Sequence, residues 1–179
     1  EAVFNAQQTI EDPQAFSADL KSRTAADGRD PDHIKVLPGI VPVIGSTEAE
    51  ALAHERVLED HIVYTHGVGN LERLLQLEPG TLELDAELPA DLPPESAIEG
   101  AKSRYTLVVE LARRDRLTVR QLIGRLGGGR GHLTFAGTPE QVADKIESWF
   151  TRGAADGFNI MPAVLPSGLD TFVDHVVPI

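Results

Sequence analysis

Residues 137–162 read GTPEQVADKIESWFTRGAADGFNIMP, and this stretch specifies a helix followed by a buried strand. Residues 138–141 predict the helix N-terminus, because a threonine cap is followed by proline in the first turn and by glutamine at the third helical position. One apolar stripe runs along the helix, formed by Val142, Ile146, Trp149 and Phe150. Residues 157–162 then have the pattern of a buried strand that ends in a loop. A helix that leads into a buried strand favours an α/β fold.

Two further strands are expected upstream. Residues 1–8, EAVFNAQQ, predict a short strand with a polar tip, and Asp12 before Pro13 predicts the N-cap of a helix that ends near Gly28. Residues 34–45, IKVLPGIVPVIG, are apolar on both faces, as in a strand buried between two layers. Because central strands rarely tolerate proline, we expect regular strand at either 35–37 or 40–44, with a bulge or loop at Pro38-Gly39.

The middle of the chain is expected to be a helical excursion. A helix starts at Ser46 or Thr47, the pattern loosens over residues 70–94, and two helices follow within residues 105–126, with Thr118 as a cap between them. A glycine-rich loop at residues 127–132 leads to a short strand at 133–137. After residue 162 a last helix is expected at 168–177. This order of elements predicts parallel strands joined by right-handed crossovers.

Composition narrows the class of protein. The 179 residues carry 16 Lys plus Arg against 28 Asp plus Glu, a formal net charge of -12 that argues against binding to nucleic acid or to anionic membranes. The absence of cysteine excludes disulfides, thiolate metal sites and cysteine nucleophiles. No apolar run approaches the ~18 residues of a membrane span. We therefore expect a soluble, cytoplasmic protein.

Several of these stretches together resemble a known family. Residues 137–162, with LPSGLDTFVDHVVP at 165–178, are similar to the end of flavin-dependent monooxygenases of the bacterial luciferase-like superfamily, in the branch with nitrilotriacetate, EDTA and dibenzothiophene-sulfone monooxygenases. The opening AVFNAQQT, the stretch GRDPDHIKVLPGIVPVIGSTEAEA and the loop GGRGH resemble the same branch. The resemblance covers nearly the whole chain, and the combination is specific although each motif alone is modest.

The resemblance implies a partial (β/α)8 TIM barrel. Residues 1–179 would form the C-terminal portion, with about the last three βα units and an irregular helical insertion at about 46–130. An ordinary barrel needs ~250 residues. It also implies reduced FMN from a separate flavin reductase, a reaction with O2 through a flavin C4a-peroxide, and a small organic substrate. Most cofactor-binding residues would then lie in a missing N-terminal barrel half, upstream of Glu1.

The candidate site residues follow from the rule that βα barrels bind ligands at the carboxyl ends of their strands. This rule selects Gln7 and Gln8, residues 42–45, and Asn159 with Met161 and Pro162. Asn159 would bond a flavin or substrate carbonyl, whereas Gln7, Gln8, Met161 and Pro162 would line the substrate pocket. The alternative is that Asn159 caps local backbone and Met161 fills the core.

The glycine-rich loop supplies two more candidates. The resemblance makes it a lid from which Arg130 and His132 would contact flavin phosphate or an acidic substrate, and the alternative is an exposed linker. No residue is assigned as a catalytic acid, base or nucleophile. A Ser-His-Asp triad is not expected, because a GxSxG motif is absent. A metal site is not expected, since the histidines lack HExxH spacing.

The sequence is compatible with two functions of different classes. The chain is either the C-terminal portion of a two-component monooxygenase or a non-catalytic barrel fragment that acts as a folding or assembly module. Three parallel strands taken from a barrel expose unpaired edges and apolar faces. We therefore expect the isolated chain to form homo-oligomers and to bind FMN weakly.

Overall fold

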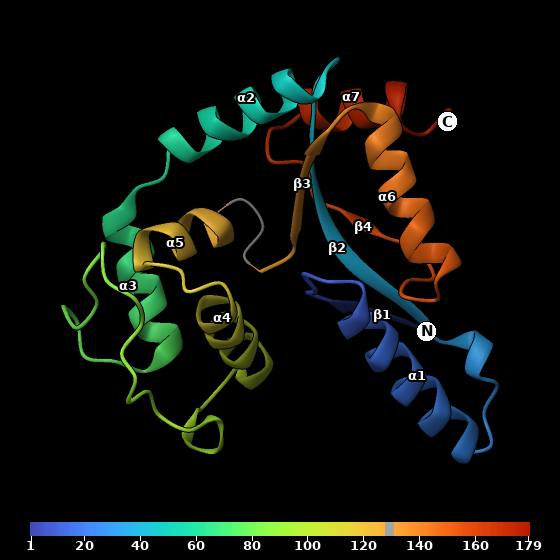
Figure 1. The fold of residues 1–179 in the computed structure, drawn as a ribbon. Coiled ribbons are helices and arrows are strands. Elements are labelled where there is room, and N and C mark those ends of the chain that lie inside the picture. Colours follow the sequence, from blue (N-terminus) through green and yellow to red (C-terminus); the bar gives the residue numbers. More distant parts are fainter. Residues whose placement is uncertain (128–130) are drawn as a thin grey trace. The chain divides into compact units, whose positions relative to one another are not determined.

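The computed structural model describes residues 1–127 and 131–179 as strands and helices in alternation (Figure 1). In chain order these are β1 (Ala2–Asn5), α1 (Glu11–Ala26), η1 (Pro31–His33), β2 (Lys35–Ile44), α2 (Glu48–Asp60), α3 (Tyr64–Leu75), η2 (Glu95–Ala97), α4 (Lys102–Arg114), α5 (Val119–Gly127), β3 (Leu133–Gly137), α6 (Pro139–Thr151), β4 (Asn159–Ile160) and α7 (Ser167–His175). Every strand pair among them is parallel. The expected α/β fold with parallel strands is confirmed.

The chain divides into two compact units. The first contains residues 1–57 and 132–179 and holds the four strands of the described residues, and the second contains residues 58–131, whose described elements are helical. The second unit begins at Leu58, twelve residues later than the start at 46 expected for the helical insertion. In the described part of the chain, no helix is long and apolar enough to cross a membrane.

Strand β2 is the centre of the first unit and runs unbroken through Pro38 and Pro42. The expected bulge or loop at Pro38-Gly39 is therefore wrong. The backbone of Val36 and of Ile40 bonds toward the β4 edge, since Asp156 N–H donates to Val36 O and Met161 N–H to Ile40 O. By strand alternation the nitrogens of both prolines face this same edge. Because β4 pairs with β2 only at residues 39 and 40, neither missing N–H interrupts a ladder.

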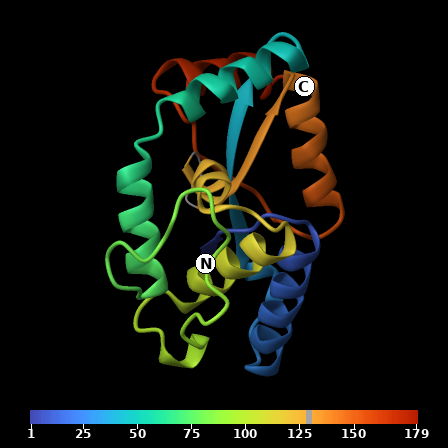
Figure 2. The same cartoon turned by 60° about the vertical axis from the view of Figure 1, so that its left-hand side comes forward.

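Helices α6 and α7 cover one face of this sheet. Val142 of α6 and Phe172 and Val176 of α7 are buried against Ile44, Phe135 and Ile160 of the strands. Figures 1 and 2 both show α6 running beside β3. Helix α6 begins with the predicted capping box, in which Gln141 N–H donates to Thr138 Oγ1 and Thr138 N–H donates to Gln141 Oε1. The strands connected through α6 are thus parallel, as expected.

The second unit has its own apolar core. Helices α3, α4 and α5 bury Leu75, Val108, Val119 and Leu122 among themselves. The carboxylate of Glu72 is buried there too, and its Oε1 accepts hydrogen bonds from the N–H groups of Gly80 and Leu82 at 2.9 and 3.0 Å. These bonds order the chain that follows α3. Helix α3 itself continues to Leu75, beyond residue 70, where the sequence pattern loosens.

Three local predictions were wrong. Helix α1 starts at Glu11 with Ile10 as the N-cap residue, so Asp12 lies inside the first turn, where its carboxylate accepts a bond from Thr9. Phe150 is 59% exposed, because it lies beside the buried stripe of α6 rather than on it. Strand β4 contains only Asn159 and Ile160 instead of a longer buried run.

Candidate functional site

The carboxyl ends of β1 and β4 both lie beside the middle of β2. Asn5, the last residue of β1, aligns with Pro38, and Ile160, the last of β4, aligns with Ile40. Strand β2 continues past this level to pair with β3. Gly39 lies at this level, whereas residues 42–45 lie within or just after the β2–β3 ladder, at the carboxyl end of β2 itself.

One face of the sheet at this level carries polar groups. Asn159 aligns with Gly39 and Thr134 aligns with Val41, so both side chains lie on the face of β2 that these two residues share. The opposite face carries Ile160 and Phe135, which pack against α6 and α7. The amide and the hydroxyl are thus held on the face turned away from those two helices.

His132 belongs to the same group. An ideal Cβ built on Gly39 would lie 2.2 Å from His132 Nδ1 and 2.8 Å from Cε1 and Cγ, so the imidazole occupies the space above Gly39. Gln8 holds the backbone at this point, since its Nε2 donates to His132 O at 3.1 Å. The structure thus brings together Gln8, His132 and Asn159, three of the residues selected from the sequence.

Thr134 is a member that the sequence reasoning missed. Its Oγ1 is buried and has no hydrogen-bond partner in the described structure. A buried hydroxyl without a partner costs about 1–3 kcal/mol, so Thr134 is a polar group that the described residues leave unsatisfied. The only sequence signal was a polar residue in the otherwise apolar strand LTFAG.

The remaining residues predicted from the sequence are not shown to contact Gln8, His132 or Asn159. Met161 and Pro162 are half-buried directly after β4, and Met161 N–H donates to Ile40 O at 2.9 Å, which continues the β4 ladder. Gln7 is half-buried after β1, and within the described residues its side chain makes no hydrogen bond to this group. Arg130 lies outside the described residues. The described residues contain no group of three His, Asp or Glu side chains that could hold a metal ion.

A carboxylate anchors the loop that enters β4. Asp156 Oδ1 accepts from Lys21 Nζ at 2.8 Å, and Oδ2 accepts from Val36 N–H at 2.9 Å. Burial raises the pKa of Asp156, but the hydrogen bonds from Lys21 and Val36 outweigh burial, and the pKa lies below its ordinary value of 3.8. Asp156 therefore connects α1, β2 and the loop that enters β4, near the cluster of Gln8, His132, Thr134 and Asn159.

The group can bind a ligand by hydrogen bonds on a rigid scaffold. Asn159 is exposed and offers both a donor and an acceptor, Thr134 offers a hydroxyl, and His132 offers an imidazole. Half-buried Met161 and Pro162 add apolar surface after β4. Hydrogen-bonding groups beside apolar surface are typical of small-molecule sites.

Comparisons with known proteins cover the whole chain. It is 44% identical to N-acetyl-S-(2-succino)cysteine monooxygenase of Bacillus subtilis over 100% of its length and 42% identical to nitrilotriacetate monooxygenase component A of Aminobacter aminovorans over 99%. It is 35% identical to dibenzothiophene-sulfone monooxygenase of Rhodococcus erythropolis over 100%. The chain spans 40%, 39% and 40% of these relatives, respectively. No family model matches it.

Solved structures agree with this result. DmoA from Hyphomicrobium sulfonivorans is 25% identical with a TM-score of 0.79, and EDTA monooxygenase from Chelativorans sp. BNC1 is 31% identical with a TM-score of 0.64. The chain is covered to 99% in both cases, and it covers 36% and 41% of the two chains. The homologues that cover this chain are luciferase-like flavin-dependent monooxygenases, and the chain matches the C-terminal part of that family.

Proposed function

We propose that this chain is the C-terminal portion of a two-component monooxygenase that uses reduced FMN and O2 to oxygenate a small organic substrate. The observation that carries the proposal is the match of the whole chain to monooxygenases at up to 44% identity. The polar group around Gly39 supports it, because that group lies at the carboxyl ends of parallel strands.

The residues present fit a flavin. The buried hydroxyl of Thr134 has no partner in the described structure, and the imidazole of His132 and the amide of Asn159 lie on the same face of the sheet. We propose that Asn159 and His132 contact the flavin, with Thr134 as an additional contact. When bound, reduced FMN supplies the electrons that activate O2. Arg130 is proposed as a phosphate or acidic-substrate contact.

Other residues of the site are proposed to position the binding groups and to shield the reacting atoms from water. Gln8 bonds to the backbone of His132 and so holds the segment that places the imidazole over Gly39. Met161 and Pro162, together with Gln7 and Gln8, are proposed to line the substrate pocket. The apolar members would keep water away from the reacting atoms.

The complete enzyme is proposed to need further protein parts and a partner enzyme. Because the chain spans only about 40% of its relatives, we propose that most flavin-binding residues lie upstream, in an N-terminal part of the barrel. A separate flavin reductase would supply reduced FMN in the cytoplasm, and the complete enzyme would form homo-oligomers. No residue of this chain is assigned as a catalytic acid or base.

The test uses the complete protein encoded by its gene. Oxygen uptake is measured with FMN, NADH and a flavin reductase, with and without nitrilotriacetate, EDTA and dibenzothiophene sulfone as probe substrates. Asn159→Ala and His132→Ala are each expected to weaken reduced-FMN affinity about tenfold, the value of one hydrogen bond to a buried group. His175→Ala, which changes an exposed histidine of α7, is the matched control.

Two results would contradict parts of the proposal. If FMN does not bind to the complete protein, the monooxygenase function is wrong. If FMN binds and Asn159→Ala and His132→Ala behave like His175→Ala, the function stands and the assigned residues are wrong.

A non-catalytic assembly module is the second candidate. The observation that favours it is the set of large apolar side chains that are more than half exposed, including Phe4 at 65% and Ile179 at 66%. Such side chains are usual at interfaces. If the gene encodes only these residues and the product associates without binding FMN, this second function holds.

A further inference from the structure

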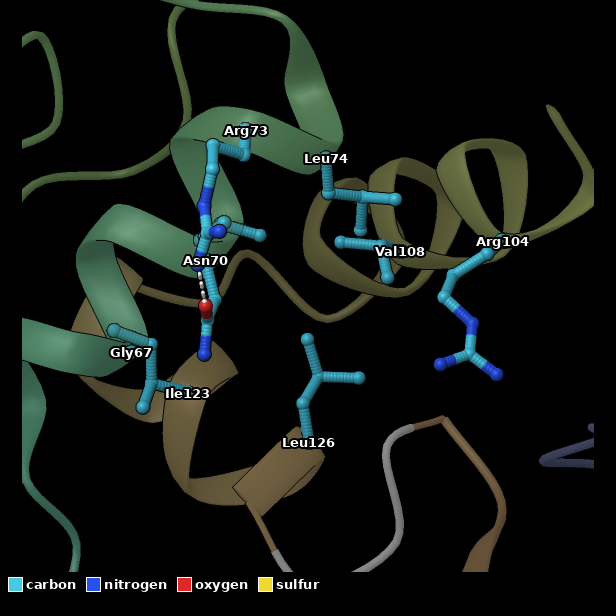
Figure 3. Close-up of a pocket in the computed structure, with 9 residues that line it drawn as sticks. Gly67, Asn70, Arg73, Leu74, Arg104, Val108, Ile123 and Leu126 are labelled. Atoms are coloured by element: carbon cyan, nitrogen blue, oxygen red, sulfur yellow. Dashed lines mark hydrogen bonds between the residues drawn. The ribbon is translucent and has the colours of Figure 1, made fainter. Parts of the chain in front are cut away.

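The second unit contains a cavity that the proposed monooxygenase function does not use. It has a volume of about 660 Å³ and lies among helices α3, α4 and α5 (Figure 3). Cavities of ~300–1,000 Å³ are the size of small-molecule sites. All of its lining residues belong to residues 58–131, so it lies within one compact unit.

The walls of the cavity are apolar. Leu74 of α3, Val108 of α4 and Leu126 of α5 surround it, and all three belong to the core of this unit or pack against it. Figure 3 shows their side chains directed toward a common space. Core packing fixes these walls, so a ligand would meet a preformed surface.

Among the described residues, the charged side chains of the lining are two arginines. Arg73 donates through Nε to Gly69 O at 3.2 Å and through Nη2 to Asn70 Oδ1, and both acceptors are neutral. Arg104 is half-buried, and its guanidinium makes no ion pair or hydrogen bond to any described residue. In the view of Figure 3 the two guanidinium groups lie on either side of Leu74 and Val108.

The missing acidic partners are unusual for this chain. Acidic residues outnumber basic ones by 28 to 16, and other arginines of the same unit have acidic partners, such as Arg120 with Asp85 at 2.8 Å, although Arg113 bonds only to Ala90 O. No carboxylate lines the cavity among the described residues. A half-buried guanidinium beside apolar walls is poorly solvated, so it favours an anion that brings its own apolar surface.

We propose that this cavity is a binding site for a small amphipathic organic anion, with a carboxylate at Arg104, Arg73 as second cation and an apolar body between Leu74, Val108 and Leu126. A guanidinium binds a carboxylate through two parallel N–H···O bonds, which gives geometric selectivity. The site is distinct from the polar group around Gly39, because it is built entirely by the second unit.

A small molecule fits better than an acidic protein segment. The space is an open concavity of about 660 Å³ among three helices, a size that suits a small molecule, whereas a peptide segment needs an extended groove or sheet edge. An acidic segment of a partner chain, or of the rest of the same protein, would also supply carboxylates. If such a segment fills the cavity, a small anion will not bind to the complete protein, and the test below would show this.

The test is a calorimetric titration of the complete protein with octanoate. Octanoate joins one carboxylate to an apolar chain, 1-octanol keeps the chain without the charge, and acetate keeps the charge without the chain. We expect octanoate to bind with a Kd below about 1 mM, which ten non-hydrogen atoms can supply. We expect 1-octanol and acetate each to bind at least roughly tenfold more weakly, since each lacks one of the two contacts.

Variants assign the binding to this cavity. Arg104→Gln is expected to weaken octanoate binding about tenfold or more and Arg73→Gln by less, because charge-assisted hydrogen bonds are lost. Arg113→Gln is the matched control, since Arg113 lies on the same helix α4 and donates only to Ala90 O. Thermal unfolding verifies that each variant folds. If Arg104→Gln does not fold, Arg104→Lys must still weaken octanoate more than Arg113→Lys does.

Several results would overturn the proposal. These are no octanoate binding to the folded complete protein, equal binding of octanoate and 1-octanol, or equal effects of Arg104→Gln and Arg113→Gln. Because FMN affinity is measured separately with Asn159→Ala, failure of this site and failure of the flavin site are distinguishable.

Discussion

The imidazole of His132 lies directly over the backbone of Gly39, so that a Cβ at position 39 would come within 2.2 Å of Nδ1. Only glycine at this position leaves room for the ring. Asn159 is aligned with the same glycine from β4, and Gln8 bonds to the backbone of His132. Position 39 therefore determines where the imidazole lies relative to the amide.

Gly39→Ala is expected to push His132 out of its place. Overpacking of this kind costs about 1–3 kcal/mol of unfolding free energy, and the double variant Gly39→Ala/His132→Ala should recover most of that loss. Gly69→Ala is the control, because a Cβ there meets no atom within 4 Å. Denaturant unfolding measures all four proteins. Equal losses in the single and double variants would show that the ring is not the obstacle.

Thr134→Val is expected to stabilise the protein and to weaken ligand binding. Valine has nearly the same shape as threonine and removes the buried hydroxyl that has no partner in the described structure, a gain of about 1–2 kcal/mol. In the complete protein the same change should lower FMN affinity. The measurements are chemical unfolding and FMN titration. A stability loss would mean that the hydroxyl is bonded within the chain.

Asp156→Asn is expected to destabilise the protein at neutral pH. The pKa of Asp156 is depressed, because burial, which raises it, is outweighed by the hydrogen bonds from Lys21 and Val36. A carboxylate with a depressed folded pKa stabilises the folded state above its unfolded value of 3.8, and this contribution is lost as the pH falls through the lower folded pKa. The substitution should therefore cost about 1–3 kcal/mol at pH 7 and progressively less below pH ~4.

Unfolding midpoints from pH 7 down to pH 3 check this pH dependence. Asp19→Asn is the control, because its partner Arg23 is 76% exposed and such surface pairs contribute about 0–1 kcal/mol. A pH-independent effect of Asp156→Asn would show that packing and not charge is responsible.

The isolated 179-residue chain is expected to self-associate. Phe150, Val177 and Ile179 are 59%, 64% and 66% exposed and line one apolar groove with buried Phe172. Sedimentation should show oligomers, and Phe150→Gln should reduce them more than Leu165→Gln, which changes an exposed leucine outside the groove. A monodisperse monomer would count against this expectation. The isolated chain should also lack sub-micromolar FMN affinity.

Local signals in the sequence were sufficient where neighbouring residues determine the structure. The capping box at Thr138 and Gln141 marks the start of α6 because both hydrogen bonds close within four residues. The strand LTFAG and the two helices around Thr118 were also predicted from local patterns of residues. Phe150 was assigned to the buried stripe of α6 although it lies at the exposed edge of that stripe, since the helical pattern alone does not show where the covering surface ends.

Pro38 shows what pairing adds. From the sequence its missing N–H argued against a continuous strand, but the strand is continuous because that nitrogen faces an edge on which β4 pairs only with residues 39 and 40. No local pattern contains this information, since the partner begins 121 residues later in the chain, at Asn159.

The sequence by itself determined the α/β class, the parallel order of the strands, the family resemblance and the choice of Gln8, His132 and Asn159. Their meeting around Gly39, the buried hydroxyl of Thr134 and the cavity with Arg73 and Arg104 were decided by the tertiary structure alone. The physical reason is that these relationships depend on strand register and on which face a side chain shares, and both arise from pairing between residues far apart in the chain.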